Sequence, residues 1–261
     1  MDSNGNRTRL GADQAVKMPS STIQDYLLAI YSLDFEQVHV IAARLAEKLE
    51  VSAPTVSVTV ERMVRDGYVD VDSNHTITLT EKGRAVGSRV ARRHRLIERW
   101  LNDMLDLDWV MLHDEAHLLE HSLSSALEQK ISEALNHPET CPHGNPIPGN
   151  AKNWSFEGMK QLSESEAGEK LKVARISELA EDNAEIMRYL QQKNLVPDTS
   201  LEVQEITPFG HVVLKVNGDM AVIDPEIAVY VWTRSAAAPK QGRRTTSTET
   251  YGIDGGLITC R

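Results

Sequence analysis

Residues 22–80 carry the pattern that most constrains the fold, because three helical segments are followed there by two short alternating runs. Apolar residues recur at helical spacing in TIQDYLLAIYSL, in VIAARLAEKLE and in APTVSVTVERM. Ser52 is a suitable N-cap for the third helix, and Pro54 stands in its first turn. The runs YVDVDSN and HTITLT alternate as the strands of a β-hairpin do. Three helices and then a two-stranded wing predict a winged helix-turn-helix.

Such a domain places its third helix in the major groove of DNA, with the N-terminal half of the helix facing the base edges. The residues that would face the bases are Ser52, Ala53, Thr55, Ser57 and Thr59. Arg44 and the wing residues Asn74 and His75 are candidates for phosphate contacts. Hydroxyl side chains at a helix start can equally serve only as caps, so a small helical domain that binds no DNA stays open as an alternative.

A second feature is the run HDEAHLLEH, which places four metal-ligand residues on one predicted helix. We expect a long helix over 81–105 and then a helix from about Trp109 to Asn136 that carries this run. His113, His117, Glu120 and His121 stand at offsets of 0, 4, 7 and 8, which puts them within an arc of roughly 100°. Neutral imidazole and ionised carboxylate both suit a divalent transition metal, so the stripe predicts a metal site.

Composition excludes several classes of protein. The 261 residues contain only two cysteines, which rules out a disulfide framework and fits a reducing cytoplasm. We find no apolar run of membrane-spanning length and no apolar signal core, so a cytoplasmic protein without membrane association is expected. The net charge of −10 argues against a general polyanion binder. One run could still form a local basic surface: Arg89, Arg92, Arg93, Arg95 and Arg99.

The pattern divides the chain into six parts. We expect a disordered arm at 1–20, the winged helix at 21–84, and a helical metal-binding domain at 85–150 that ends in the proline-rich loop HPETCPHGNPIPGN. A linker follows at 151–169, and a disordered tail at 236–261. Between them, at 170–235, a helical stretch and the runs SLEVQEI, HVVLKV, MAVIDP and IAVYVW predict a small β-barrel of the SH3 type. The fold class is therefore mainly α with small β parts.

In this order, the segments resemble the diphtheria-toxin-repressor and manganese-transport-regulator family of metal-dependent transcriptional regulators. The resemblance covers about residues 20–235 and rests on LEVSAPTVSVTVERMVRDGY, LTEKGRA, RRHRLIERWL, HDEAHLLEH and HGNPIPG. The C-terminal part resembles the SH3-like (FeoA-like) domain of many members. The resemblance implies a homodimer that binds a palindromic double-stranded DNA operator when loaded with Mn(II) or Fe(II) and so controls metal homeostasis.

The resemblance also implies the metal ligands of a primary site, with departures from the known patterns. By position, these ligands are Asp25, His117, Glu120 and His121. Iron-type members have methionine at Asp25 and cysteine at His117, whereas manganese-type members share the aspartate but have glutamate at His117 and at Leu28. The site here has only oxygen and nitrogen donors. Hard oxygen donors favour Mn(II), with Fe(II) next and Zn(II) or Co(II) as substitutes in vitro.

A second site in the family draws a His and a Glu from the long helix, which match His94 and Glu98. His113 would join them, with Glu178 and Glu181 from the SH3-like domain. Some manganese-type members instead use a Cys and a His of the proline-rich loop, which match Cys141 and His143. Both sets cannot be complete around one ion of ordinary coordination number, so the composition of this site stays open.

For DNA recognition, the resemblance points to Ser52, Pro54, Thr55 and Ser57. Where the iron-type pattern has a glutamine that faces the groove, this chain has Val58, which can only pack against a thymine methyl. The operator sequence therefore stays open.

Two other functions compete with this one. The run HLLEH, residues 117–121, also matches the H-x-x-E-H zinc signature of a peptidase, in which Glu120 would be a general base. This short pattern leaves two positions free, and the chain lacks the length for a large substrate cleft beside its winged helix. The third possibility is a DNA-binding protein whose metal is structural and senses nothing.

Overall fold

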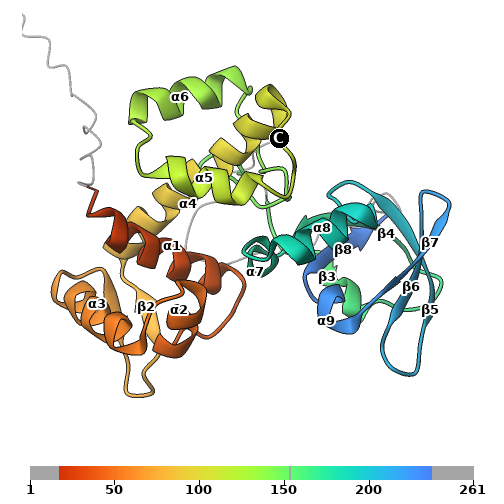
Figure 1. Ribbon diagram of the computed structural model, residues 1–261, viewed down its shortest axis with the longest axis horizontal. Helices are drawn as coiled ribbons and strands as arrows, with labels where there is room; N and C mark the ends of the chain where they lie inside the picture. The colour runs from red at the N-terminus through yellow and green to blue at the C-terminus, as the bar shows by residue number, and fades with distance from the viewer. Residues whose placement is uncertain (1–17, 153, 237–261) are drawn as a thin grey trace, which may run out of the picture.

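The computed structural model describes residues 18–152 and 154–236 (Figure 1). Almost all of the expected arm at 1–20 and tail at 236–261 therefore lies outside the described residues. Three parts follow one another along the chain: a winged-helix domain (18–80), a helical domain (81–150) and a sheet domain (159–235). Within the described ranges, no helix is both long and apolar enough to cross a lipid bilayer.

The winged helix predicted from the sequence is confirmed. Its elements are α1 (Ser21–Phe35), α2 (Ala42–Lys48), α3 (Ala53–Arg65), β1 (Val69–Val71) and β2 (Ile77–Leu79). Ser52 caps α3 by accepting a hydrogen bond from the backbone N–H of Thr55, and β1 pairs with β2 in antiparallel register. Leu27, Leu45 and Met63 are fully buried at the centre of the domain, so the apolar faces of α1, α2 and α3 form one core.

Helix α4 (Glu81–Leu105) belongs to two domains at once. Its N-terminal half packs on α1 so closely that a Cβ at Gly87 would lie 2.9 Å from the carbonyl oxygen of Leu27. Its C-terminal half packs on α5 (Leu112–Glu120) and α6 (Ser125–Ala134), with Leu96 and Ile97 in that core. Any change in how α1 sits on α4 therefore changes how the winged helix sits on the helical domain.

The single helix expected from Trp109 to Asn136 is wrong, because α5 and α6 are separate (Figure 1). Residue His121 is the C-cap of α5, and Ser124 caps α6 by accepting from the backbone N–H of Leu127. Serine side chains compete for backbone hydrogen bonds and favour helix ends, which explains the break in the sequence HSLSS.

The sheet domain is SH3-like, as predicted, and holds six antiparallel strands in the order β3-β8-β4-β5-β6-β7. Its elements are β3 (Met159–Gln161), η1 (Leu162–Glu164), β4 (Lys170–Ile176), α7 (Glu178–Glu181), α8 (Ala184–Gln192), β5 (Ser200–Ile206), β6 (Val212–Val216), β7 (Asp219–Ile223), α9 (Pro225–Ala228) and β8 (Val231–Ser235). Buried Val173, Val203 and Leu214 form part of its core.

Two sequence readings in this region are corrected. The expected linker at 151–169 contains β3 and η1, and β3 pairs with β8 at the end of the chain. The run IAVYVW is not one strand, because Asp224 caps α9 and Pro225 begins it, so that the strand β8 starts only at Val231. Strand β4 was not anticipated, since the helical pattern that follows it dominated that stretch. Short α7 lies at the side of the sheet domain that faces the other two domains (Figure 1).

Candidate metal centres and DNA-reading helix

The four residues of the predicted primary site lie together where α1 meets the end of α5. One donor atom from each of Asp25, His117, Glu120 and His121 lies within 4.8 Å of the others. Asp25 Oδ1 is 2.7 Å from Nε2 of His121, and Glu120 Oε1 is 3.1 Å from Nδ1 of His117. The break after α5 leaves this cluster intact, because His121 is still at the helix end. We call it the primary cluster.

Electrostatics keeps the primary cluster ready for a cation. Glu120 is fully buried, which by itself raises the pKa of a carboxyl, but His94 and His117 outweigh burial and lower the pKa of Glu120 to about 2. His117 is 52% exposed, so the cluster is open on one side. Two carboxylates and two imidazoles around an open position fit a divalent cation such as Mn(II) or Fe(II).

A second cluster forms between α4, α5 and α7. Its members are His94, Glu98, His113 and Glu181, and their donor atoms also lie within 4.8 Å of one another. His94 Nε2 is 3.2 Å from Glu98 Oε1, and His113 Nδ1 is 3.3 Å from Glu181 Oε2. The sheet domain therefore contributes Glu181. Glu178, which the sequence also suggested as a ligand, lies outside this cluster, because its Oε1 accepts a hydrogen bond from Arg95 Nε at 2.7 Å.

The alternative pair from the proline-rich loop reaches the same place. Glu98, Cys141 and His143 form a third group of adjacent donors, all of them buried. His143 Nδ1 lies 3.3 Å from Glu98 Oε1 and 3.5 Å from Glu181 Oε1. Glu98 therefore lies beside both donor sets that the sequence left open. From here on, the second cluster means all six residues: His94, Glu98, His113, Cys141, His143 and Glu181.

The hydrogen bonding and protonation of its donor atoms also make the second cluster suitable for a cation. Within the described residues, both carboxylate oxygens of Glu98 and Nδ1 of His143 are buried and make no hydrogen bond of regular geometry, although Glu98 and His143 lie within 3.3 Å of each other. Buried polar atoms are normally satisfied, and a bound ion would satisfy these. Burial also raises the pKa of the Cys141 thiol well above its ordinary value, so Cys141 is protonated unless a cation stands beside it.

His94 connects the two clusters. Its Nδ1 donates to Glu120 Oε2 at 2.7 Å, while its Nε2 faces Glu98. Burial disfavours the charged ring, but Glu98 and Glu120 outweigh this and raise the pKa of His94 to about 9. If Nε2 holds a metal, the N–H at Nδ1 still orients Glu120, which is how outer hydrogen bonds set the geometry of a metal ligand.

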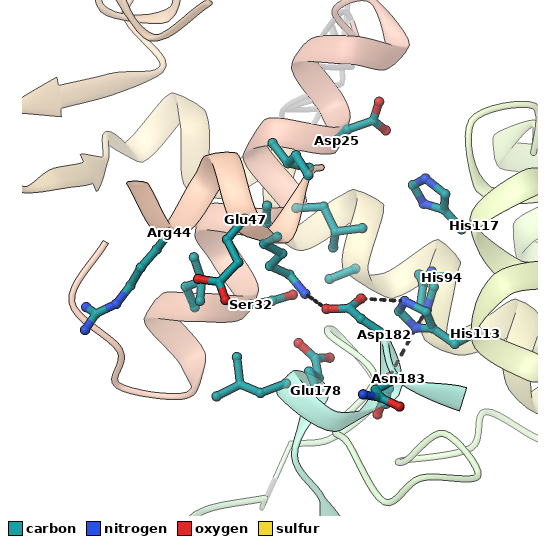
Figure 2. A pocket seen from close by; sticks show the side chains of 18 of the residues that line it. Asp25, Ser32, Arg44, Glu47, His94, His113, His117, Glu178, Asp182 and Asn183 are labelled. Carbon is teal, nitrogen blue, oxygen red and sulfur yellow. Dashed lines mark hydrogen bonds and ion pairs between the residues drawn. The ribbon is translucent and has the colours of Figure 1, made fainter. Parts of the chain in front are cut away.

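Asp182, which no sequence pattern singles out, also contacts the second cluster. Its Oδ1 lies 3.1 Å from His113 Nε2, and its Oδ2 lies 2.5 Å from Nζ of Lys48 at the end of α2. Burial is outweighed by His113 and Lys48, which lower the pKa of Asp182 to about 2. Figure 2 shows Asp182 and His113 on the wall of a cavity of about 820 Å³ that is also lined by Asp25 and His117. Both clusters therefore border one space between the domains.

The predicted DNA-reading residues lie on the solvent side of α3 or at its start. Ser52, Pro54, Thr55 and Ser57 are exposed, Thr59 is half-buried, and Val58 is 68% exposed. The hydroxyls of Ser57 and Thr59 donate to backbone carbonyls of their own helix. Arg44 on α2 and the wing residues Asn74 and His75 are exposed too. Among the described residues of α3, the exposed large apolar side chains are Val58 and Val64.

The basic run on α4 does not supply a DNA surface. Arg92 and Arg93 both bind the carboxylate of Glu128, at 2.8 and 3.1 Å, and Arg95 is 1% exposed. These arginines are internal links between α4, α6 and the sheet domain, because helical periodicity turns them toward neighbouring elements. The candidate drawn from the sequence is wrong for these three residues.

Three family models match the chain, in the order of its domains. They are the iron-dependent repressor N-terminal DNA-binding domain at residues 18–76, the iron-dependent repressor metal-binding and dimerisation domain at 80–149, and the FeoA domain at 160–234. The last match includes residues of β3, in agreement with the sheet.

Relatives and solved structures agree with these matches. The chain is 38% identical over 219 residues to the iron-dependent repressor IdeR of Mycobacterium leprae, covering 78% of this chain and 92% of the relative. It is 36% identical over 211 residues to the diphtheria toxin repressor of Corynebacterium diphtheriae, with shares of 78% and 92%.

Among solved structures, a manganese-dependent transcriptional repressor in complex with manganese superposes with a TM-score of 0.74 at 32% identity, covering 82% of this chain and 99% of the other. The manganese regulator SloR gives a TM-score of 0.69 at 28% identity, with shares of 82% and 98%. The three domains thus follow one another in the order of the matched family models, and the chain belongs to the iron-dependent repressor family of metal-dependent transcriptional regulators.

Proposed function

We propose that this chain is a repressor that binds a palindromic operator as a homodimer when Mn(II) or Fe(II) occupies its primary cluster. The observation that carries this proposal is the position of the cluster. Asp25 lies on α1, which precedes α2 and α3 in the winged-helix domain. Glu120, His117 and His121 lie on the helical domain. A cation there supplies positive charge that holds the carboxylates of both domains together. Asp25 and Glu120 would then fix α1, and with it α3, relative to the second copy of the chain.

The donor set favours Mn(II), with Fe(II) next. The primary cluster has two carboxylates and two imidazoles and no sulfur, and hard oxygen donors suit Mn(II). Zn(II) and Co(II) are expected to substitute in vitro, because imidazole binds them well. In the second cluster, Cys141 adds a softer donor, so the two clusters are expected to differ in metal preference.

Exposed apolar side chains in the helical domain support the homodimer. They lie at the end of α4 and on α5 and α6, and we infer that they contribute to one apolar face, as interfaces do. They include Met104, Leu105, Leu118 and Leu127, with Leu118 71% exposed. The dimerisation model of the family covers the same residues. We infer that a second copy covers this face and spaces two α3 helices for the two halves of a palindrome.

In this reading, α3 enters the major groove with Ser52, Pro54, Thr55, Ser57 and Val58 toward the bases. Val58 would pack on a thymine methyl. Arg44 and the wing would hold phosphates and supply a local attraction that the net charge of −10 does not exclude.

We do not favour the hydrolase alternative. A general base must have a free carboxylate, but Glu120 is fully buried and contacts His94 and His117. The family consists of transcriptional repressors, which supports a non-enzymatic role for HLLEH.

The test is binding to duplexes that the Mn(II)-loaded protein selects from a random DNA pool. We expect the selected sites to be palindromic, and their fluorescence anisotropy to rise with Mn(II) or Fe(II) and fall with chelator. Equal affinity for the selected duplex with and without metal would leave only a structural role for the ion. Cleavage of a peptide library by the zinc-loaded protein would support the peptidase reading instead.

A further inference from the structure

A buried charge cluster lies where the three domains meet, outside both metal clusters. Two guanidinium groups lie over the ring of Phe35, the last residue of α1, with the ring centre 5.1 Å from Cζ of Arg95 and 5.0 Å from Cζ of Arg175. Arg95 comes from α4 and Arg175 from β4. Each domain therefore contributes one member to this stack, which we call the junction.

Two carboxylates balance the two arginines of the junction. Arg175 pairs with Glu36 of the winged-helix domain, and Arg95 pairs with Glu178 of the sheet domain. Glu36 also accepts a hydrogen bond from the backbone N–H of Glu178 at 2.9 Å. The Arg175 side chain is fully buried, and the Glu36 side chain is 2% exposed. Charges this deeply buried must be paired, so each arginine admits only one arrangement of the domains.

The junction continues into the second metal cluster through Asn145. Nε of Arg175 donates to Oδ1 of Asn145 at 2.6 Å, and Nδ2 of Asn145 donates to Oε1 of Glu181 at 2.6 Å. The other oxygen of Glu181, Oε2, faces His113 at 3.3 Å. Asn145 therefore holds Oε1 of this carboxylate beside His143, while Oε2 is directed toward His113.

We propose that the junction is an interdomain latch in which Arg175 and Asn145 position Glu181 for the second metal centre and fix the sheet domain to the end of α1. The positioning role rests on the proposed function, because it requires the second cluster to bind metal. The latch itself depends only on the packing of the domains. Arg175 is suited to the task because its planar guanidinium binds Glu36 and Asn145 at the same time and stacks on Phe35.

The test uses the full chain with Arg175→Met, which keeps an unbranched apolar stem and removes the guanidinium donors. We expect the affinity of the second centre for Mn(II), measured by calorimetry and by the loss of the free Mn(II) EPR signal, to fall about 10- to 100-fold, as for loss of an outer hydrogen bond. The primary centre keeps its affinity. Arg175→Lys retains the positive charge but not the planar guanidinium, so we expect its second-centre affinity for Mn(II) to stay close to that of Arg175→Met. Arg188→Met, at an exposed position of α8 in the same domain, is the control and should change neither centre.

Domain geometry gives a readout that needs neither metal nor DNA. Spin labels at Glu61→Cys on α3 and Lys215→Cys on β6, two exposed positions, report the distance between the domains in a Cys260→Ser background. The parent should give one narrow distance distribution and Arg175→Met a broad one. Unchanged second-centre affinity and a narrow distribution in Arg175→Met would overturn the latch. A parent with a single class of Mn(II) site would overturn the positioning role, while the primary-centre and operator titrations would show separately whether the proposed function holds.

Discussion

Replacing Asp25 with alanine separates the role of the primary cluster in metal binding from any role in the fold. Asp25 is the one member of the cluster that α1 contributes, and its Oδ1 lies 2.7 Å from His121 Nε2. The side chains of Asp25 and His121 are 28% and 20% exposed. Around this pair, α1 is held by buried apolar residues such as Leu27 and Ile30, which Asp25→Ala leaves in place.

The two effects of Asp25→Ala differ in size. A partly exposed ion pair contributes about 0–1 kcal/mol, so the free energy of unfolding in chelator should change by no more than that. Loss of a hydrogen bond to a metal ligand already weakens metal binding about 10- to 100-fold. Loss of a ligand itself should therefore reduce the free energy of Mn(II) binding by at least about 1.4–2.7 kcal/mol. Operator binding then requires correspondingly more Mn(II).

The assays are urea unfolding in chelator, Mn(II) titration, and anisotropy with the selected duplex at several Mn(II) concentrations. Asp34→Ala is the matched control, because Asp34 is on the same helix and pairs with Arg84 at the surface. The control should keep parental metal and operator affinities. If Asp25→Ala bound the duplex as tightly as the parent with the same Mn(II) dependence, the idea that the ion ties α1 to the helical domain would be refuted.

Three further outcomes are expected. Leu118→Glu, at a 71% exposed apolar position, should convert the homodimer to a monomer, as measured by light scattering. Glu115→Gln on the same helix should remain dimeric, and a dimeric Leu118→Glu would place the interface elsewhere. Gly83→Ala should lower the free energy of unfolding by about 1–3 kcal/mol, because the new Cβ would lie 1.9 Å from the carbonyl oxygen of Tyr68. Alanine is the better helix former, so equal or greater stability in urea would contradict this prediction. Because the pKa of His94 is raised from 6.5 to about 9, its charge stabilises the metal-free fold below pH 6.5 and that stabilisation is lost as pH rises toward 9. Over the same range Mn(II) affinity should rise, since binding releases the proton, and calorimetry that found no pH dependence would count against His94 as a ligand.

The secondary-structure elements and the chemistry of the donor residues follow from local sequence patterns. Helical spacing, the Ser52 cap and the alternating runs are local signals, so the winged helix could be predicted from residues 22–80 alone. The run HDEAHLLEH likewise indicated a metal site, since ligand types on one helix face are visible in the sequence. Local signals were less reliable at HSLSS and around 151–176, where caps and strand pairing with β8 and β5 decided the structure.

Which charged side chains pair with one another depends instead on how the domains pack. Arg95 and Glu178 are 83 residues apart in the sequence and Arg175 and Glu36 are 139 apart, and no periodicity links such pairs. Packing of α4 against the sheet domain paired Glu178 with Arg95 and so removed it from the second cluster. Contacts of α5 with the sheet domain brought Asp182 to His113, and contacts of α4 with α6 paired Arg92 and Arg93 with Glu128. The same packing placed Glu98 between the two donor sets that the sequence could not choose between. Burial makes each unpaired charge costly, so the fold as a whole, and not the local pattern, selects the partners.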